Sequence, residues 1–210
     1  MTPPHIDPGT EFDRQVHTLI DKGYPALSGR TPEAFADLLE PLRKTVTADP
    51  PASGPVPFVL VVTRDVAPIE RTVPLLTLDG RTRTGVIDRN FPDPDRFVPA
   101  AGVTLPDPRA YVLFGVDRGE EFCGAVPDHA MATIAERGRT PLTIEDGVAL
   151  VTQHPAVLAK NKCFSLGGSR CGDRRVPALW ISQNAPKLGW CWAGNPHTWL
   201  GVASATRRAA

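Results

Sequence analysis

The stretch from Val176 to Thr206 carries one charged residue, Lys187, and this feature constrains the fold more than any other. Apolar residues within it form three short runs, at 178–182, 188–193 and 198–203. Asn, Gly and Pro residues separate the runs, which are too short to span a membrane and have the length of buried strands. We therefore predict an antiparallel meander, whose apolar strands must be covered by the rest of the chain.

The N-terminal segment predicts helices. Apolar residues recur at helical spacing from 11 to 20, and Gly23 can adopt the left-handed conformation that ends a helix. Thr31 is a suitable N-cap for a second helix, which starts with a proline and carries one apolar stripe. Together these helices form a predicted helical arm over 11–47.

A linker then leads from the helical arm into a predicted sheet. Residues 48–57 include four prolines, which cannot donate backbone hydrogen bonds, so we predict a linker within a single domain. Runs typical of strands follow at 58–63, 73–78, 84–87 and 110–116. Asp79 and Gly80 suit a tight turn between the second and third of these runs. The segment 58–210 is therefore predicted to contain a mainly antiparallel sheet.

Two further helices are predicted between the strands. The first runs from Pro127 to Gly138, and the second is capped by Thr143. Two consecutive helices of this kind also occur in DNA-binding helix-turn-helix motifs. Here, however, the acidic residues Glu145 and Asp146 lie at the end of the second helix that would contact the DNA phosphates. We therefore predict a helical hairpin that packs on the sheet, and the fold class is a single α+β domain.

Charge and hydropathy exclude some partners and locations. The chain has 23 Lys and Arg residues and 23 Asp and Glu residues, so it lacks a general field for nucleic acid or an anionic membrane. It has no apolar run of membrane-spanning length, and its first residues do not resemble a signal peptide. We predict a cytoplasmic protein with thiols or metal ligands in place of disulfides.

All four tryptophans lie within one short segment. They are Trp180, Trp190, Trp192 and Trp199, and Cys191 and His197 lie among them. Tryptophans on predicted strands can fill a core, because each brings a large apolar area. They can also line an aromatic pocket for a planar or sugar-like ligand. The sequence leaves both interpretations open.

An arginine-rich segment lies just before the tryptophans. Gly167-Gly168-Ser169-Arg170 can form a tight curve whose N–H groups converge, and Arg174 and Arg175 add positive charge. This pattern predicts binding of an anionic ligand by Arg170, Arg174 and Arg175. It lacks the Gly-Lys-Ser/Thr ending of a nucleotide P-loop, and solvated arginines beside a turn are the alternative.

Cysteine and histidine residues could form a zinc or thiol centre. The candidate zinc ligands are Cys163, Cys171, Cys191 and His197. Their types suit tetrahedral zinc, but the closely spaced cysteine pair of most structural sites is missing, so buried free cysteines are the alternative. In a catalytic interpretation, Cys191 or Cys171 is the nucleophile and His197 its base. Asp173 or Asn195 would then orient the imidazole.

The turn at 194–196 decides which of these residues meet. If it joins two paired strands through three residues, Cys191 and His197 lie on one face as diagonal neighbours. A two-residue turn would instead place His197 beside Trp190 and Trp192. The first register favours a thiol–imidazole site, and the second favours an aromatic pocket.

Three long segments of the chain are distinctive. They read DHAMATIAERGRTPLTIEDGVALVTQHP, CFSLGGSRCGDRRVPALWIS and APKLGWCWAGNPHTWLG. Together with residues 11–42, they resemble an uncharacterised protein family common in high-GC Gram-positive bacteria. Because that family has no established activity, the resemblance implies kinship and assigns no catalytic role.

These observations predict a protein that binds a small molecule through residues 163–199. The ligand or substrate would be anionic or aromatic, and a Cys/His or zinc centre would make the protein an enzyme. The alternative is a non-catalytic binding or protein-interaction module that uses the tryptophans and arginines as its surface.

Overall fold

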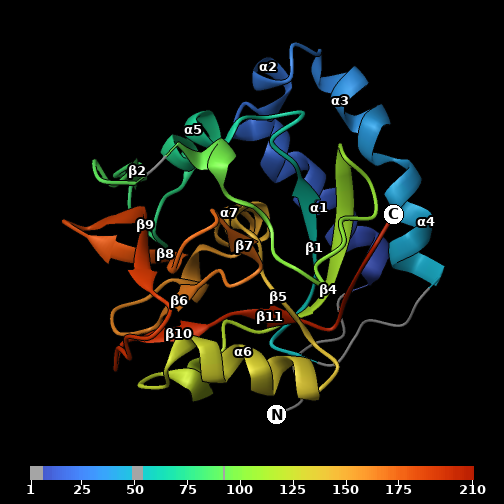
Figure 1. The fold of residues 1–210 in the computed structure, drawn as a ribbon. Coiled ribbons are helices and arrows are strands. Elements are labelled where there is room, and N and C mark those ends of the chain that lie inside the picture. Colours follow the sequence, from blue (N-terminus) through green and yellow to red (C-terminus); the bar gives the residue numbers. More distant parts are fainter. Residues whose placement is uncertain (1–6, 49–53, 92) are drawn as a thin grey trace.

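Helices at the N-terminus begin where the sequence places prolines and caps. The computed structural model, which describes residues 7–48, 54–91 and 93–210, starts with α1 (Pro8–Asp21), α2 (Tyr24–Leu27), α3 (Pro32–Leu39) and α4 (Pro41–Ala48) (Figure 1). The Asp7 carboxylate caps α1 by accepting from the Thr10 N–H at 2.9 Å, and the Thr31 hydroxyl caps α3 by accepting from the Ala34 N–H at 3.2 Å. The predicted helices are confirmed. The second is divided, because Pro41 cannot donate the next helical hydrogen bond.

A three-stranded antiparallel sheet lies against these helices. Its order is β1 (Val56–Val62), β4 (Ala110–Val116) and β12 (Arg207–Ala209). Because side chains alternate along a strand, Phe58 and Leu60 pack on the N-terminal helices, while Val59 and Val61 face the main core. The strand begins at Val56, so the end of the predicted linker at 48–57 belongs to the sheet; residues 49–53 lie outside the described residues.

A five-stranded sheet forms the other half of the fold. Its order is β10 (Leu200–Val202), β6 (Cys163–Ser165), β8 (Arg175–Ser182), β9 (Ala185–Trp192) and β2 (Val86–Ile87). The three central strands are antiparallel to one another, whereas β10 and β2 each run parallel to their neighbours. The predicted meander is correct for β8 and β9 and wrong for the third strand, since β10 pairs with β6 and not with β9.

The predicted strand at 73–78 is also wrong. This region contains α5 (Ile69–Thr72) followed by a 3-10 helix at Val73–Leu75, because Pro74 has no N–H to donate to a sheet. The turn at Asp79 and Gly80 is confirmed: Gly80 has φ 62° and the Leu78 carbonyl accepts from the Arg81 N–H at 3.0 Å. The shorter elements are β3 (Val98–Pro99), β5 (Thr140–Pro141), β7 (Ser169–Arg170), β11 (Ser204–Ala205) and the 3-10 helices Pro94–Arg96, Glu120–Phe122 and Pro155–Val157.

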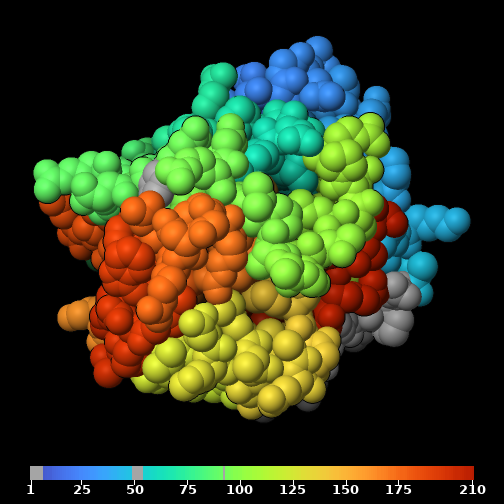
Figure 2. Space-filling view, in the orientation of Figure 1, coloured from blue at the N-terminus to red at the C-terminus, as the bar shows by residue number. Residues whose placement is uncertain are grey.

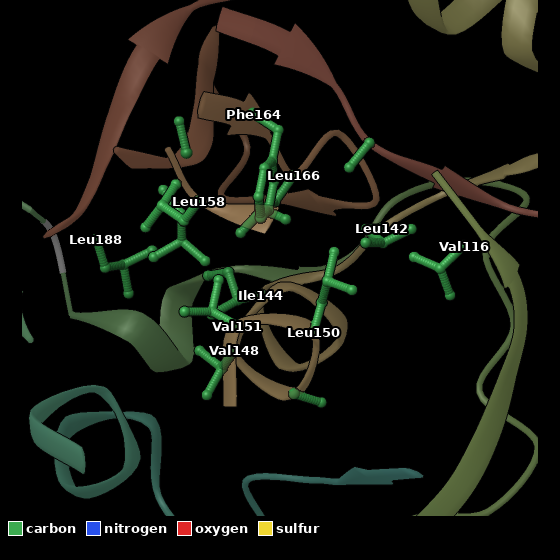
Figure 3. Close-up of a cluster of buried hydrophobic side chains, with 14 of the residues drawn as sticks. Val116, Leu142, Ile144, Val148, Leu150, Val151, Leu158, Phe164, Leu166 and Leu188 are labelled. Carbon is green, nitrogen blue, oxygen red and sulfur yellow. The ribbon is translucent and has the colours of Figure 1, made fainter. Parts of the chain in front are cut away.

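Helix α7 (Ile144–Gln153) occupies the centre of the domain, and every one of its residues is buried. Val148, Leu150 and Val151 of this helix join Phe164 and Leu188 of the five-stranded sheet in the main hydrophobic cluster (Figure 3). The preceding helix, α6 (Pro127–Glu136), packs in a separate, smaller cluster at the surface. The two consecutive helices are therefore confirmed, but they bury their apolar faces in different clusters.

A buried polar network fixes the start of α7. The Tyr111 hydroxyl donates to Asp146 Oδ1 at 2.7 Å, and Asp146 also pairs with Arg208 of β12. Arg208 donates to Thr140 Oγ1 at 2.7 Å and to the Pro141 carbonyl at 2.9 Å. The Arg208 and Asp146 side chains are 3% and 0% exposed, so the C-terminal strand is held by an ion pair inside the protein.

None of the described helices combines the length and the apolar character that a membrane span requires.

Candidate functional site

The pairing of β8 with β9 separates the tryptophans into two groups. Trp180 is opposite Lys187, and Cys191 is opposite Val176, which places Trp180 and Cys191 on one face of the sheet. Trp190 and Trp192 alternate with Cys191 and lie on the other face. The Trp190 indole donates to a backbone carbonyl of the loop after β2, that of Asn90, at 3.1 Å.

Trp180 and Trp199 form an edge-to-face pair. Their ring centroids are 6.4 Å apart and the rings are inclined by 71°. Gly189 of β9 is necessary for this arrangement, because a Cβ atom there would lie 2.0 Å from Cη2 of Trp180. The Trp199 carbonyl accepts from the Cys163 N–H at 3.1 Å, which fixes the second indole beside β6.

Two cavities meet at this pair of indoles. The first, here called the tryptophan cavity, has a volume of about 370 Å³ and is lined by all four tryptophans together with Cys191, Asn195 and His197. The second, here called the amide cavity, has a volume of about 550 Å³ and is lined by Trp180, Trp199, Asn161, Gln183, Asn184 and Lys160, among others. We call the two cavities together the aromatic groove. In the space-filling view, the orange and red segment that carries the groove forms one side of the molecule, beside the yellow helix α6 (Figure 2).

The structure places Cys191 and His197 at the same cavity, where each contacts a different neighbour. The Cys191 Sγ lies 3.6 Å from the Ser165 hydroxyl, whereas the His197 ring packs against Trp199 at 5.4 Å. Residues 193–199 form a loop between β9 and β10, so neither predicted hairpin register occurs. The loop is held in part by a hydrogen bond from the Gly124 N–H to the His197 carbonyl, at 2.9 Å.

The electrostatics of the thiols also differ from those of a nucleophile. Burial raises the pKa of Cys191, and this effect outweighs the opposing effects of the Ser165 hydrogen bond and the Arg170 charge. Burial and the neighbouring carboxylate of Asp173 raise the pKa of Cys171. A reactive thiol requires the opposite shift, toward the thiolate at neutral pH. The observed environments favour neutral thiols.

The predicted zinc ligands do not converge. Their three sulfur atoms have different neighbours: the Ala159 carbonyl for Cys163 at 3.8 Å, Asp173 for Cys171 at 3.3 Å and Ser165 for Cys191 at 3.6 Å. Within residues 7–48, 54–91 and 93–210, one group of side chains lies close enough together to hold a metal ion. It consists of the exposed acids Glu70, Asp93 and Asp95. The set Cys163, Cys171, Cys191 and His197 is therefore corrected, because these residues hold separate positions in the sheet and its loops.

The Gly-Gly-Ser-Arg segment uses its backbone groups within the protein. The Gly168 N–H donates to the Leu142 carbonyl at 2.8 Å, and the Ser169 N–H donates to the Leu166 carbonyl at 3.2 Å. The Ser169 hydroxyl accepts from the Ile144 N–H at 3.0 Å. The prediction that these N–H groups converge on an anion is wrong, because the segment instead anchors the start of α7.

The three predicted anion-binding arginines lie outside the aromatic groove. Arg170 contacts helix α6, with Nη2 at 3.0 Å from Met131 Sδ and 3.7 Å from Asp128 Oδ1. The Arg175 guanidinium lies over the Trp190 ring at 5.1 Å. Arg174 extends toward Gly194, where a Cβ atom would lie 2.6 Å from its Nη2.

The amide residues of the groove were not identified from the sequence. Asn161, Gln183 and Asn184 line the amide cavity, but they come from two turns that are distant along the chain. The sequence indicated a break between two apolar runs at 184–186, and the turn of the structure lies at Gln183 and Asn184. This turn became a signal for a site only when the structure placed it beside Trp180.

Comparison with known proteins identifies the family of this chain, but that family has no assigned activity. A family model described as "Family of unknown function (DUF5701)" matches residues 18–210. No curated protein and no solved structure matches the chain. The geometry of the aromatic groove is therefore the main evidence for function.

Proposed function

The chain belongs to DUF5701, a family of unknown function, and we propose that it binds a neutral, hydroxylated ring such as a sugar in the aromatic groove. The observation that carries the proposal is the Trp180–Trp199 pair, which contributes to the walls of both cavities. Aromatic rings provide flat apolar surfaces on which the C–H face of a sugar can stack. Polar groups at the edge of a mainly apolar cavity then orient the ligand.

The composition of the groove favours a neutral ligand over an anion. Its polar residues include the amides of Asn161, Gln183, Asn184 and Asn195. Each amide offers both a donor and an acceptor, which matches the dual character of a hydroxyl group. Among the residues that line the two cavities, Lys160 carries a formal charge. Arg170, Arg174 and Arg175 line neither cavity.

The angle between the indoles favours a sugar over a planar aromatic ligand. A planar ring is held most effectively between two parallel aromatic faces. Trp180 and Trp199 are inclined by 71°, and His197 is inclined by 41° to Trp199, so these rings form walls of a corner and not a sandwich. A non-planar ring can stack on one wall while its hydroxyl groups reach the amides.

Binding is better supported than either catalysis or a protein interface. Burial raises the pKa of the Cys191 thiol, which disfavours the thiolate that nucleophilic attack requires. A docking surface for another protein would show a contiguous apolar patch. The exposed large hydrophobic residues among those described are Val86, Val98 and Trp192, which lie on three different strands.

The four indole N–H signals in a nitrogen–proton NMR spectrum test the proposal. Titration with glucose, galactose and N-acetylglucosamine, with adenosine as the planar comparison, should shift the signals of Trp180 and Trp199 most. Trp180→Ala and Trp199→Ala should each weaken the best sugar about tenfold, which corresponds to about 1.4 kcal/mol. Trp192 also contributes to the lining of the tryptophan cavity, but its side chain belongs to the opposite face of β9, so Trp192→Ala should weaken binding less.

Two results would contradict the proposal. One is that none of these sugars shifts an indole signal at millimolar concentration. The other is that adenosine binds and the sugars do not, which would replace the hydroxylated ring with a planar one. Spectra of all variants should retain the dispersion of the parent protein, so that a loss of binding is not a loss of folding.

A further inference from the structure

We propose that the aromatic groove has two subsites and takes a saccharide of at least two rings, with the amide cavity as the second subsite. This inference rests on the proposed function and specifies its ligand class. Trp180 and Trp199 line both cavities, so a ring bound in the tryptophan cavity has the amide cavity as its direct neighbour. With about 370 Å³ and about 550 Å³, the two spaces are each large enough for one ring of a linked pair.

The backbone of the amide cavity provides a second observation. Among the residues that the structure describes, the non-glycine residues with positive φ are Asn161 at 60°, Gln183 at 50° and Asn184 at 60°. All three line the amide cavity. Left-handed backbone is sterically unfavourable for residues other than glycine, and asparagine tolerates it better than glutamine does. Strained residues of this kind tend to gather at binding sites.

Glycine would satisfy both turns with less strain. Gln183 and Asn184 are the two central residues of the β8–β9 hairpin, a position where asparagine followed by glycine is preferred. Asn161 lies in the tight turn that closes the bridge between Ala159 and Lys162. The chain therefore carries amide side chains at three positions where the backbone alone would favour a residue without a side chain.

The sheet brings these two turns together. β6 runs antiparallel to β8, with Phe164 opposite Leu179, so the turn before β6 lies beside the turn after β8. Arg83 Nη1 donates to the backbone carbonyl of Gln183 at 2.7 Å, and Arg83 Nη2 donates to the side-chain Oε1 of Gln183 at 3.4 Å. Because Arg83 donates to Oε1, we expect the Gln183 amide nitrogen to be the group that donates to a ligand hydroxyl.

Glycine substitutions separate a ligand role from a structural one. Gln183→Gly and Asn184→Gly remove an amide while relieving the backbone, so the thermal midpoint should stay equal or rise. The probes are glucose, cellobiose and maltose, measured by the indole signals and by calorimetry. In the parent protein the better disaccharide should bind about tenfold more tightly than glucose, and each glycine variant should lose most of that advantage.

Gln183→Asn, which keeps an amide at the turn, is the matched control and should retain more of the disaccharide advantage than Gln183→Gly. The inference is overturned if glucose binds as tightly as both disaccharides, or if the glycine variants keep the parent's disaccharide affinity. Glucose binding without a disaccharide advantage would contradict the two-subsite inference alone. Absence of binding by all the sugars would contradict the proposed function as well.

Discussion

The Gly-Gly-Ser-Arg segment and the aromatic groove are neighbours in the sequence, yet the fold uses them in opposite ways. In the segment, the N–H groups of Gly168 and Ser169 bond to carbonyls of the same chain. In the groove, Trp180 and Trp199 line cavities at the surface. From residue types alone, both regions are equally plausible ligand-binding sites. The comparison teaches that a polar group is available to a ligand only when the fold has not already supplied its partner.

The glycines of the two regions show the same contrast. A Cβ atom on Gly168 would lie 2.5 Å from the Pro141 carbonyl oxygen, which belongs to the backbone. A Cβ atom on Gly189 would instead meet the outer atoms of the Trp180 indole. The first glycine permits two backbone segments to pack closely, and the second permits an aromatic side chain to lie across a strand.

The largest expected effect tests whether the start of α7 is a structural anchor. Arg208→Met leaves Asp146 buried without its cation, and breaking a buried pair in this way costs about 3–5 kcal/mol of unfolding free energy. Urea denaturation measures the loss. As the control, Arg43→Met removes the more exposed pairs with Asp13 and Glu40 and should cost less than Arg208→Met, about 1 kcal/mol. Similar small losses in both variants would show that the buried network does not anchor the domain.

Alanine at the two glycines tests the contrast between the regions. Gly168→Ala should lower the unfolding free energy by about 1–3 kcal/mol, because the backbone around it cannot move aside easily. Gly189→Ala should cost less stability, since the Trp180 indole can rotate away, but it should weaken sugar binding.

Urea denaturation and the sugar titration, applied to both variants, give the comparison. A variant of Gly189 with unchanged sugar affinity would show that the position of the Trp180 indole is not important for the groove. A variant of Gly168 with unchanged stability would show that the segment tolerates a side chain, contrary to its tight contacts.

The smallest expected effect concerns the thiol beside the groove. Because burial raises the pKa of Cys191, less thiolate is present at any given pH than for a free cysteine, whose pKa is about 8.5. Iodoacetamide should therefore modify Cys191 slowly at neutral pH, with a rate that rises only in alkaline solution. Peptide mass spectrometry measures this rate across the pH range.

The His197→Ala variant is the informative comparison for this thiol. It should leave the pH profile of Cys191 modification unchanged, since Ser165 and not His197 is the hydrogen-bond partner of the thiol. Rapid modification near neutral pH that disappears in His197→Ala would support the hypothesis of a Cys191–His197 catalytic dyad. It would contradict the interpretation of the groove as a binding site without a reactive thiol.

Much of the local structure could be predicted from the sequence. Thr31 and Thr143 cap their helices by accepting from the Ala34 and Asp146 N–H groups, three residues away. The strand at 110–116 has the predicted bounds. These features depend on residues close together along the chain, whose steric and hydrogen-bonding preferences act before distant segments meet. The concentration of tryptophans also indicated the region of the candidate site.

The pairing of distant segments was decided only by the tertiary structure. β10 could have paired with β9, the strand that precedes it in the sequence, but lies parallel to β6. This choice ruled out both predicted hairpin registers and placed Trp199 beside Trp180. Local patterns establish that a segment is a strand, but its partner depends on which arrangement buries the most apolar surface and satisfies the most backbone groups at once. The sequence alone therefore determined the N-terminal helices, α6, α7, the longer strands and the aromatic character of the site. The short strands, the shape of the groove and the partners of its polar groups arose from contacts between distant residues.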